Sequence, residues 1–281
     1  MSFFRLIRRQ TLRPAWEFTT KGIIWRLQPA SGGLIIGEER DLDSKSASFF
    51  CIELSVGTPL WKEKSFGQQW WTGIAGVYRD TLLLHGYATP DMPGQKGITG
   101  IDCATGKILW EAPELSCVAT TGGTIRASRT TPLGRVLCEL DRRTGNVIRE
   151  LGEEAEYGSA GGTDEVLSDT FFPQPLSGEG GAPDLHELAG RAGIAAGTDD
   201  TVEYVDLGPN VIFGFYERET GDPPLFHSVL GSVNRAERTV QFRLTVNEGV
   251  SFPSPDTFLV AGGVVLFVRG RRTLTAIPLR T

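Results

Sequence analysis

The sequence predicts an all-β fold built from a repeated four-stranded unit. The chain has 281 residues with 35 Gly and 16 Pro, and so many turn-forming residues favour short strands over long helices. The stretch "IDCATGKILW" (Ile101–Trp110) contains an apolar strand that ends at Asp, a Thr-Gly turn and a second strand that ends at Trp. Because this pattern recurs along the chain, we interpret it as an internal repeat.

Three further segments carry the pattern: Cys51–Trp61, Glu139–Arg149 and, more weakly, Ser232–Phe242. Asp or Asn leaving the strand can accept hydrogen bonds from the turn backbone, and Gly supplies a positive φ. The Trp or Phe is a large apolar wedge suited to the gap between neighbouring sheets. The predicted wedges are Trp25, Trp61, Trp110 and Phe242.

The two ends of the chain supply a fifth copy in two pieces. "LTAIPLRT" stops at Thr281, where the turn should begin, and "KGIIW" (Lys21–Trp25) supplies the strand that should follow. The N-terminal strand is therefore expected to complete the last sheet and to leave no edge exposed. Apolar runs upstream of the motifs are expected to form the second strand of each unit, at residues 33–40, 81–88, 123–130, 210–219 and 264–270.

A four-stranded unit that repeats every 36 to 49 residues or so is typical of β-propeller blades. We predict a single propeller domain over residues 1–281, with five blades and with six as the alternative. Residues 1–20 form a basic N-terminal segment. Residues 152–200 are interpreted as an acidic insertion that caps one face and contains a short helix around 184–196. A decayed sixth blade is the other interpretation of this insertion.

The motif "IDCATGKILW" resembles the repeat of the PQQ-like β-propellers, the superfamily of quinoprotein dehydrogenases and their non-enzymatic relatives. The match is close in this copy and weaker in the others. The whole chain also resembles an uncharacterised bacterial propeller family. The resemblance implies a propeller, but it does not imply quinone-dependent chemistry, because this chain has no adjacent Cys pair and no secretion signal.

Composition and motifs exclude several functions. A net charge of −6 and a pI near 5.3 give no electrostatic case for nucleic-acid binding. The Thr-Gly-Lys run is not a phosphate-binding loop, which needs GxxxxGK[ST] between a strand and a helix. The four cysteines lie in apolar runs without a CxxC pair, so buried free thiols are favoured and a disulfide is the alternative. The three histidines have no neighbouring ligand at metal spacing, and we expect neither a metal nor a cofactor.

All blades of a propeller point the same way, so equivalent strand ends converge on one face, where ligands bind. The ends of the predicted second strands all carry charged or polar aromatic side chains. They form a candidate ligand- or partner-binding rim of Glu38, Arg40, His85, Tyr87, Arg126, Arg129, Glu217, Arg218, Arg269 and Arg271. The other interpretation is that these are ordinary solvated loop residues.

Two functions are consistent with this pattern. The favoured one is a non-catalytic scaffold that binds a protein or peptide partner on one face. The alternative is a small-molecule-binding or enzymatic propeller that uses the rim around His85. A cytoplasmic location is expected, because no apolar stretch approaches the ~18 residues that span a bilayer. A monomer is expected as well. Residues 1–13 are interpreted as a segment that packs on the domain or is mobile, and weak contact with an anionic membrane surface is the alternative.

Overall fold

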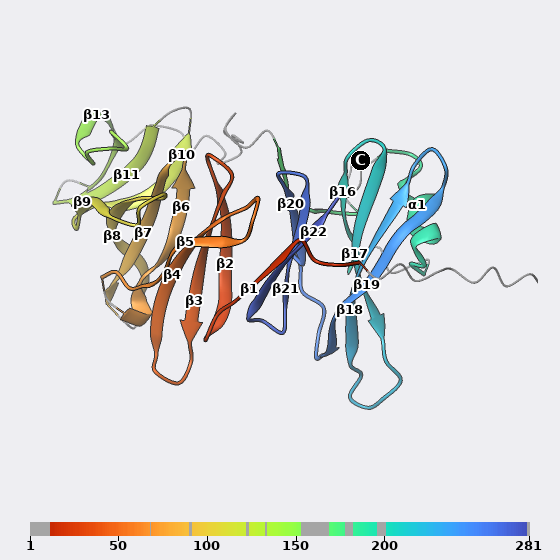
Figure 1. The fold of residues 1–281 in the computed structure, drawn as a ribbon. Helices are drawn as coiled ribbons and strands as arrows, with labels where there is room; N and C mark the ends of the chain where they lie inside the picture. The colour runs from red at the N-terminus through yellow and green to blue at the C-terminus, as the bar shows by residue number, and fades with distance from the viewer. Residues whose placement is uncertain are drawn as a thin grey trace, which may run out of the picture. The chain divides into compact units, whose positions relative to one another are not determined.

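The computed structural model describes residues 12–67, 69–89, 92–121, 124–132, 134–152, 169–177, 182–195 and 201–279. The chain forms two compact units (Figure 1). The N-terminal unit is Phe18–Ser168, and the C-terminal unit is Asp169–Thr281 together with Met1–Glu17. The basic segment up to residue 11, and with it the alternative of a membrane contact there, lies outside the described residues. So does the acidic stretch 153–168 of the predicted insertion.

The N-terminal unit contains three antiparallel four-stranded sheets whose strands follow one another in chain order (Figure 1). The first sheet consists of β2 (Ile23–Ala30), β3 (Leu34–Asp41), β4 (Ser46–Glu53) and β5 (Thr58–Lys64). The second, after the 3-10 turn η1 (Gln69–Trp71), consists of β6 (Gly73–Tyr78), β7 (Thr81–Thr89), β8 (Met92–Asp102) and β9 (Ile108–Ala112). The third consists of β10 (Ser116–Thr121), β11 (Thr124–Thr131), β12 (Gly134–Leu140) and β13 (Val147–Gly152).

The C-terminal unit contains two five-stranded sheets. One has the order β15 (Gln174–Pro175), β16 (Glu203–Asp206), β17 (Asn210–Arg218), β18 (Phe226–Asn234) and β19 (Thr239–Val250). The other has the order β14 (Thr170–Phe171), β20 (Phe258–Ala261), β21 (Val264–Arg269), β22 (Thr273–Pro278) and β1 (Trp16–Thr19). These sheets confirm the prediction of an all-β chain with repeated antiparallel units, and the predicted second strands are β3, β7, β11, β17 and β21.

The N-terminal strand of the chain does pair with the last strand, but it is not the strand that the sequence pattern selected. β1 lies beside β22, and the Ala15 backbone N–H donates to the Ala276 carbonyl at 2.8 Å. Residues 23–25 instead begin β2, which is the first strand of the next sheet. The prediction that Trp25 is a wedge is wrong: Trp25 is 61% exposed, whereas Trp16 on β1 is 9% exposed.

The motif hairpin has the same register in four sheets. In each, the strand after the turn bulges between the residue paired with the motif's Ile, Leu or Val and the wedge position. A bulge adds one residue to one strand and shifts the pairing that follows. The wedge position therefore meets the residue before the motif's Ile, Leu or Val, in the pairs Cys51–Trp61, Gly100–Trp110, Glu139–Arg149 and Ser232–Phe242. This shared bulge shows that the weak copy at Phe242 is a true member of the repeat.

Each of the two motif copies that end in Trp, at Trp61 and Trp110, binds the next sheet through that tryptophan. Trp61 Nε1 donates to the Cys103 carbonyl and Trp110 Nε1 donates to the Arg142 carbonyl, both at 2.8 Å. Both rings are buried, at 7% and 8% exposure. The turn glycine of the next copy lies against the ring, since a Cβ at Gly145 would lie 2.5 Å from Trp110 Cδ2. The motif thus joins successive sheets through a close contact that only Gly permits.

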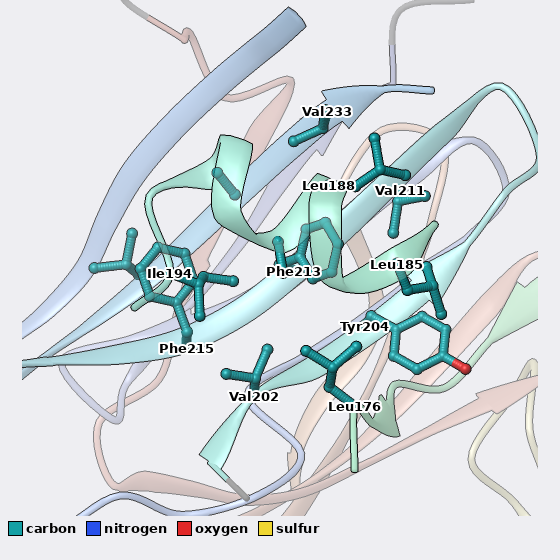
Figure 2. Packing of buried hydrophobic residues seen from close by; sticks show 13 residues of the cluster. Leu176, Leu185, Leu188, Ile194, Val202, Tyr204, Val211, Phe213, Phe215 and Val233 are labelled. Atoms are coloured by element: carbon teal, nitrogen blue, oxygen red, sulfur yellow. The ribbon is translucent and has the colours of Figure 1, made fainter. Parts of the chain in front are cut away.

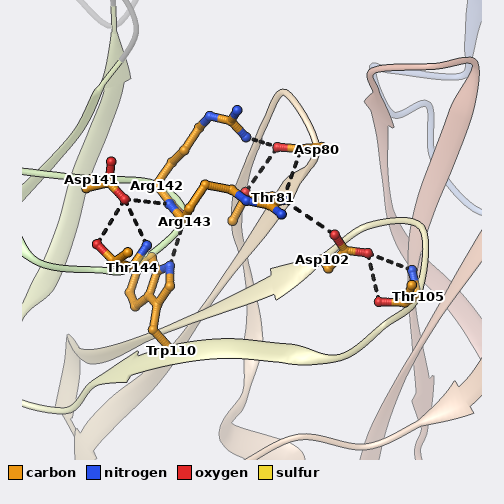
Figure 3. A network of polar contacts seen from close by, with 9 residues as sticks. All are labelled: Asp80, Thr81, Asp102, Thr105, Trp110, Asp141, Arg142, Arg143 and Thr144. Atoms are coloured by element: carbon orange, nitrogen blue, oxygen red, sulfur yellow. Dashed lines mark hydrogen bonds and ion pairs between the residues drawn. The ribbon is translucent and has the colours of Figure 1, made fainter.

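Polar groups around these turns complete the connection (Figure 3). Asp141 Oδ1 accepts hydrogen bonds from the Thr144 backbone and hydroxyl at 2.9 Å each, as the repeat pattern predicts. Arg142 and Arg143, in the turn of the third sheet, both form ion pairs with Asp80 in the β6–β7 turn of the second sheet. The turns of neighbouring sheets in the N-terminal unit are therefore held together by charge as well as by packing.

The other two wedge positions differ from the two copies that end in Trp. Arg149 takes the place of Trp in the third sheet and forms an ion pair with Glu139, its partner across the strands, with Nε to Oε2 at 2.8 Å. Phe242 is half-buried against an apolar cluster of the C-terminal unit. The wedge is therefore not uniform along the repeat.

The predicted short helix is α1 (Leu185–Ala192), and it packs on the β15–β19 sheet (Figure 2). Leu185 and Leu188 are buried together with Val211, Phe213 and other apolar side chains of that sheet. Gly193 ends the helix in the left-handed conformation that glycine favours. Within the described residues, the insertion contributes an apolar cover for one sheet face.

Candidate functional site

Four residues of the predicted rim lie close together in the N-terminal unit: Glu38 and Arg40 on β3, and His85 and Tyr87 on β7. Glu38 and His85 are almost fully buried, at 2% and 7% exposure. They meet at Gly73, the first residue of β6, which pairs with His85 in the sheet. A Cβ at Gly73 would lie 3.2 Å from His85 Nε2, 3.3 Å from Arg40 Nη2 and 3.5 Å from Glu38 Oε2. Glycine here allows the three charged or polar groups to approach the backbone.

Glu38 and Arg40 form a buried ion pair that fixes the chain between the first two sheets. Arg40 Nε donates to Glu38 Oε1 at 2.7 Å, and the other carboxylate oxygen accepts the Ile74 backbone N–H at 2.9 Å. Arg40 also donates to the carbonyls of Trp70 and Thr72. Buried charges need such partners because unpaired burial is costly. Both oxygens of Glu38 are engaged, so the pair has a positioning role.

His85 is the buried titratable group of this cluster. Burial lowers the pKa of the His85 imidazole below its usual value, and this effect outweighs the hydrogen bond to the Gly86 carbonyl and the Glu38 charge, which raise it. Its Nδ1 lies 3.2 Å from the Gly86 carbonyl oxygen, and its Nε2 lies 3.4 Å from Gln95 Nε2. The imidazole is therefore neutral at pH 7, with its ring nitrogens directed at Gly86 and Gln95.

Two more aromatic side chains extend the cluster toward solvent. Tyr87 packs edge-on against His85 with ring centroids 5.1 Å apart, and Trp71 packs edge-on against Tyr87 at 6.1 Å. Trp71 is 37% exposed. We call Trp71, Tyr87 and His85 the aromatic patch. Beside it, Trp70 is covered by Arg40 at 5.0 Å and Lys45 at 5.5 Å from the ring centre, in cation–π contacts.

The remaining rim residues of the N-terminal unit do not join this cluster. Arg126 directly follows Ile125, the residue that pairs with the motif leucine, so it lies earlier on its strand than His85 does on β7. Its Nε is buried without a hydrogen-bond partner among the residues that the structure describes. Arg129 forms an exposed ion pair with Glu150. The rim residues predicted from the sequence therefore do not all lie at equivalent positions along their strands.

The other four rim residues lie in the C-terminal unit and have their own partners or face solvent. Glu217 forms an ion pair with Arg243. Arg269 forms one with Glu17 on β1, at 3.2 Å. Arg218 and Arg271 are exposed. Within this unit they form separate surface contacts, so convergence of the whole rim stays a prediction.

Sequence reasoning did not identify several members of the cluster. Thr72 and Gly73 are anchors for it, and Gln95 lies beside the imidazole. All three are separated from β3 and β7 by loops, and their types are common in turns. The adjacent residues Trp70 and Trp71 were the one feature of the sequence that pointed to this cluster. A strand start would place the two rings on opposite faces, but they lie in η1, a turn, and both reach the cluster.

Sulfur and acidic groups add no further site within the described ranges. Cys51, Cys103 and Cys138 are buried free thiols, and Cys117 is half-buried. Burial raises the pKa of the Cys51 thiol to about 12, which keeps it protonated and unreactive. No group of three or more His, Cys, Asp or Glu side chains suited to a metal ion occurs among the described residues. None of the described helices is long and apolar enough to cross a membrane.

The fold defines an all-β protein of repeated, blade-like sheets, and comparison with known proteins adds a family similarity over part of the chain. Residues 27–110, which run from β2 to β9, match the family described as "Domain of unknown function (DUF4905)". No curated protein matches the chain.

The chain also matches solved structures, at low sequence identity and low structural similarity. They include a eukaryotic initiation factor (10% identity, TM-score 0.34, 92% of this chain and 54% of that one). Another is the β-propeller domain of the Trilobed protease from Pyrococcus furiosus (9%, 0.31, 87% and 78%). A third is the uncharacterized protein lmo1340 from Listeria monocytogenes EGD-e (10%, 0.34, 93% and 97%). The chain thus spans about half the length of the first of these, and its blade-like architecture rests on its own sheet order.

Proposed function

We propose that the chain is a non-catalytic five-bladed β-propeller that binds a protein or peptide partner through the aromatic patch. Among the described residues, five antiparallel sheets that each contain a four-stranded unit support the blade number. In the N-terminal unit, the first strands β2, β6 and β10 contact one another in sequence, as first strands around a propeller axis do. A cytoplasmic monomer is part of the same proposal.

The observation that carries the binding role is the partly exposed aromatic patch on a rigid base. Trp71 is 37% exposed and Tyr87, which packs edge-on against it, is half-buried. Aromatic side chains are among the residues that most often dominate the energy of peptide recognition. Beneath them the Glu38–Arg40 pair fixes η1 and the start of β6. A patch held by buried ion pairs loses little conformational entropy when a ligand binds.

The alternative is a small-molecule site that uses the neutral imidazole of His85. The lowered pKa of His85 favours it, because a neutral ring nitrogen can accept a proton or a hydrogen bond. His85 is only 7% exposed, and both oxygens of the Glu38 carboxylate already accept hydrogen bonds. These two observations favour the peptide-binding proposal instead.

Selection of a random dodecapeptide library on the immobilised protein tests the proposal. Selected peptides are then labelled and titrated against the wild type, Trp71→Ala and Ile108→Ala. Ile108 is the control because it is a 50% exposed apolar residue of the same unit, on β9, outside the patch. We expect Trp71→Ala to weaken binding by about 10-fold or more, and Ile108→Ala to change it by less than about 2-fold. Peptides that bind both variants as tightly as the wild type would refute the patch as the binding site.

A further inference from the structure

The first strands of the five sheets differ in how their free edges are protected. In the N-terminal unit, β2, β6 and β10 are edge strands, and each carries a bulge in its pairing with the second strand. The bulged residues are Trp25, Ala75 and Val118. Bulges disturb the row of backbone groups at an edge and so discourage another strand from pairing with it.

The two first strands of the C-terminal unit have no such bulge. β16 pairs with β17, and β20 pairs with β21, in unbroken register. Regular edges of this kind readily accept an added strand. In this chain both are already occupied, by a single extended stretch of the insertion. We call this stretch, Thr170–Leu176, the strap.

The strap runs from one sheet to the next along these edges. Its residues Thr170 and Phe171 pair antiparallel with Ala261 and Val260 of β20. Gln174 and Pro175 then pair antiparallel with β16. The Leu176 backbone N–H donates to the Val202 carbonyl at 2.8 Å. One segment therefore pairs with two residues on the free edge of each first strand in this unit.

The last residue of the strap is buried, whereas most of the strap is exposed to solvent. Leu176 is 4% exposed and lies in the cluster beneath α1, near Val202 and Tyr204 (Figure 2). Phe171 and Phe172 are 41% and 48% exposed, although aromatic side chains gain most from burial. Among the described residues, two short ladders, the Leu176 N–H bond to Val202 and one buried apolar side chain secure the strap, so it resembles a bound peptide more than a sheet strand.

We propose that the edges of β16 and β20 are a docking site for an extended peptide with an aromatic pair, prolines and a leucine after them, and that the strap is a displaceable intrachain occupant of it. The partner would pair with both strands as the strap does, and its leucine would take the place of Leu176. This site belongs to the C-terminal unit. It is therefore independent of the aromatic patch, and either proposal can fail without the other.

A peptide with the sequence of residues 169–177 (DTFFPQPLS) is the probe. It is labelled and titrated by fluorescence polarisation against the wild type and a variant in which residues 170–176 are replaced by Gly and Ser. We expect the variant to bind the peptide at least about 10-fold more tightly than the wild type, because the tethered strap competes at an effective concentration of about millimolar. A scrambled peptide and a variant with Glu219–Pro224 replaced by Gly and Ser are the controls, and neither should reproduce the gain.

A folded strap variant that does not bind the peptide, or equal binding by the wild type, overturns the proposal. Hydrogen exchange of the wild type gives an answer even if the variant does not fold. Amides of the strap should exchange about 10-fold or more faster than those of β17 and β21, because the strap detaches without unfolding of its sheets. Equal protection of the strap and these strands would show that it is a fixed part of the fold.

Discussion

Gly145 and Gly33 have the same backbone conformation in different surroundings. Both have a φ of 69°, which disfavours any residue with a Cβ. A Cβ at Gly33 would meet nothing within 4 Å, whereas one at Gly145 would lie 2.5 Å from the Trp110 ring. We expect Gly33→Ala to cost about 1 kcal/mol and Gly145→Ala about 2–4 kcal/mol, since the second change also displaces a packed ring. Urea denaturation followed by circular dichroism measures both.

A second background tests whether the ring causes the difference. In Trp110→Ala, the space beside Gly145 opens, and Gly145→Ala should then cost only the ~1 kcal/mol of its φ. If Gly145→Ala costs the same with and without Trp110, the contact between the ring and the turn does not stabilise the junction of the two sheets.

Trp110 itself should be among the most sensitive positions of the N-terminal unit. Trp110→Ala removes a ring that is 8% exposed and should cost about 3–5 kcal/mol. Trp25→Ala is the control, because that side chain is 61% exposed and its loss should cost less than about 1 kcal/mol. Chemical denaturation of the two variants provides the measurement, and a loss below about 1 kcal/mol for Trp110→Ala would contradict the wedge role.

His85 should make stability depend on pH. Burial lowers its pKa in the folded state, so the unfolded chain binds a proton more readily. Stability from this residue is therefore complete above the unfolded pKa of about 6.5 and is lost as pH falls below it. His85→Gln cannot titrate and should lose less stability than the wild type between roughly pH 7.5 and 5.5.

Thermal melts of the wild type and of His85→Gln in a pH series make this measurement. Equal slopes for the wild type and His85→Gln would show that burial of the imidazole does not oppose its protonation.

At the scale of elements, β1 is the strand on which the last sheet depends most directly. Without it, β22 becomes an edge whose backbone groups lack partners, and the buried ring of Trp16 is lost. We expect deletion of residues 1–19 to prevent folding of the C-terminal unit, as seen by loss of its cooperative thermal transition. Deletion of residues 1–11 keeps β1 and is the control. An unchanged melting temperature after removal of β1 would contradict its role in the sheet.

The elements also show how far local pattern extends. The motif hairpins and second strands were predictable, because apolar runs, Asp and Gly act on residues next to them in sequence. The choice between residues 16–19 and 21–25 as the closing strand was not, since both segments contain a Trp and only tertiary pairing separates them. The strap was also missed, because "TFFPQP" has no alternating pattern and its prolines argue against a strand.

At the scale of the whole molecule, the sequence repeat made the fold predictable, whereas the candidate site could not be predicted from the sequence. Because the same residue types recur in each copy of the repeat, even the weak copy ending at Phe242 could be aligned with the others. The site has no such redundancy. Glu38, Arg40 and His85 meet through Gly73, and nothing in the sequence around Gly73 distinguishes it from the glycines of ordinary turns. Arg126 resembles a strand-end residue in sequence, but its register places it earlier on its strand than His85 lies on β7.

Pairing of β1 with β22 also makes a prediction about chain connectivity. If these strands form the last motif hairpin, residue 279 can be joined to residue 12 through a short Thr-Gly-containing turn, and new ends can be opened in the exposed β3–β4 turn around Asp43. We expect this circular permutant to fold with a melting temperature within about 10 °C of the wild type, because the join restores a hairpin and the cut falls at a solvent-exposed turn.

A second permutant shows whether β1 and β22 form a closed hairpin or only touch incidentally. A chain with the same new ends but a long flexible Gly-Ser join should be less stable than the one with the short turn, since closing a longer loop costs more entropy. Thermal denaturation of the two permutants makes the comparison. If the short join prevents folding while the long one permits it, β1 and β22 do not meet as a hairpin, and the last sheet is assembled differently from the other four.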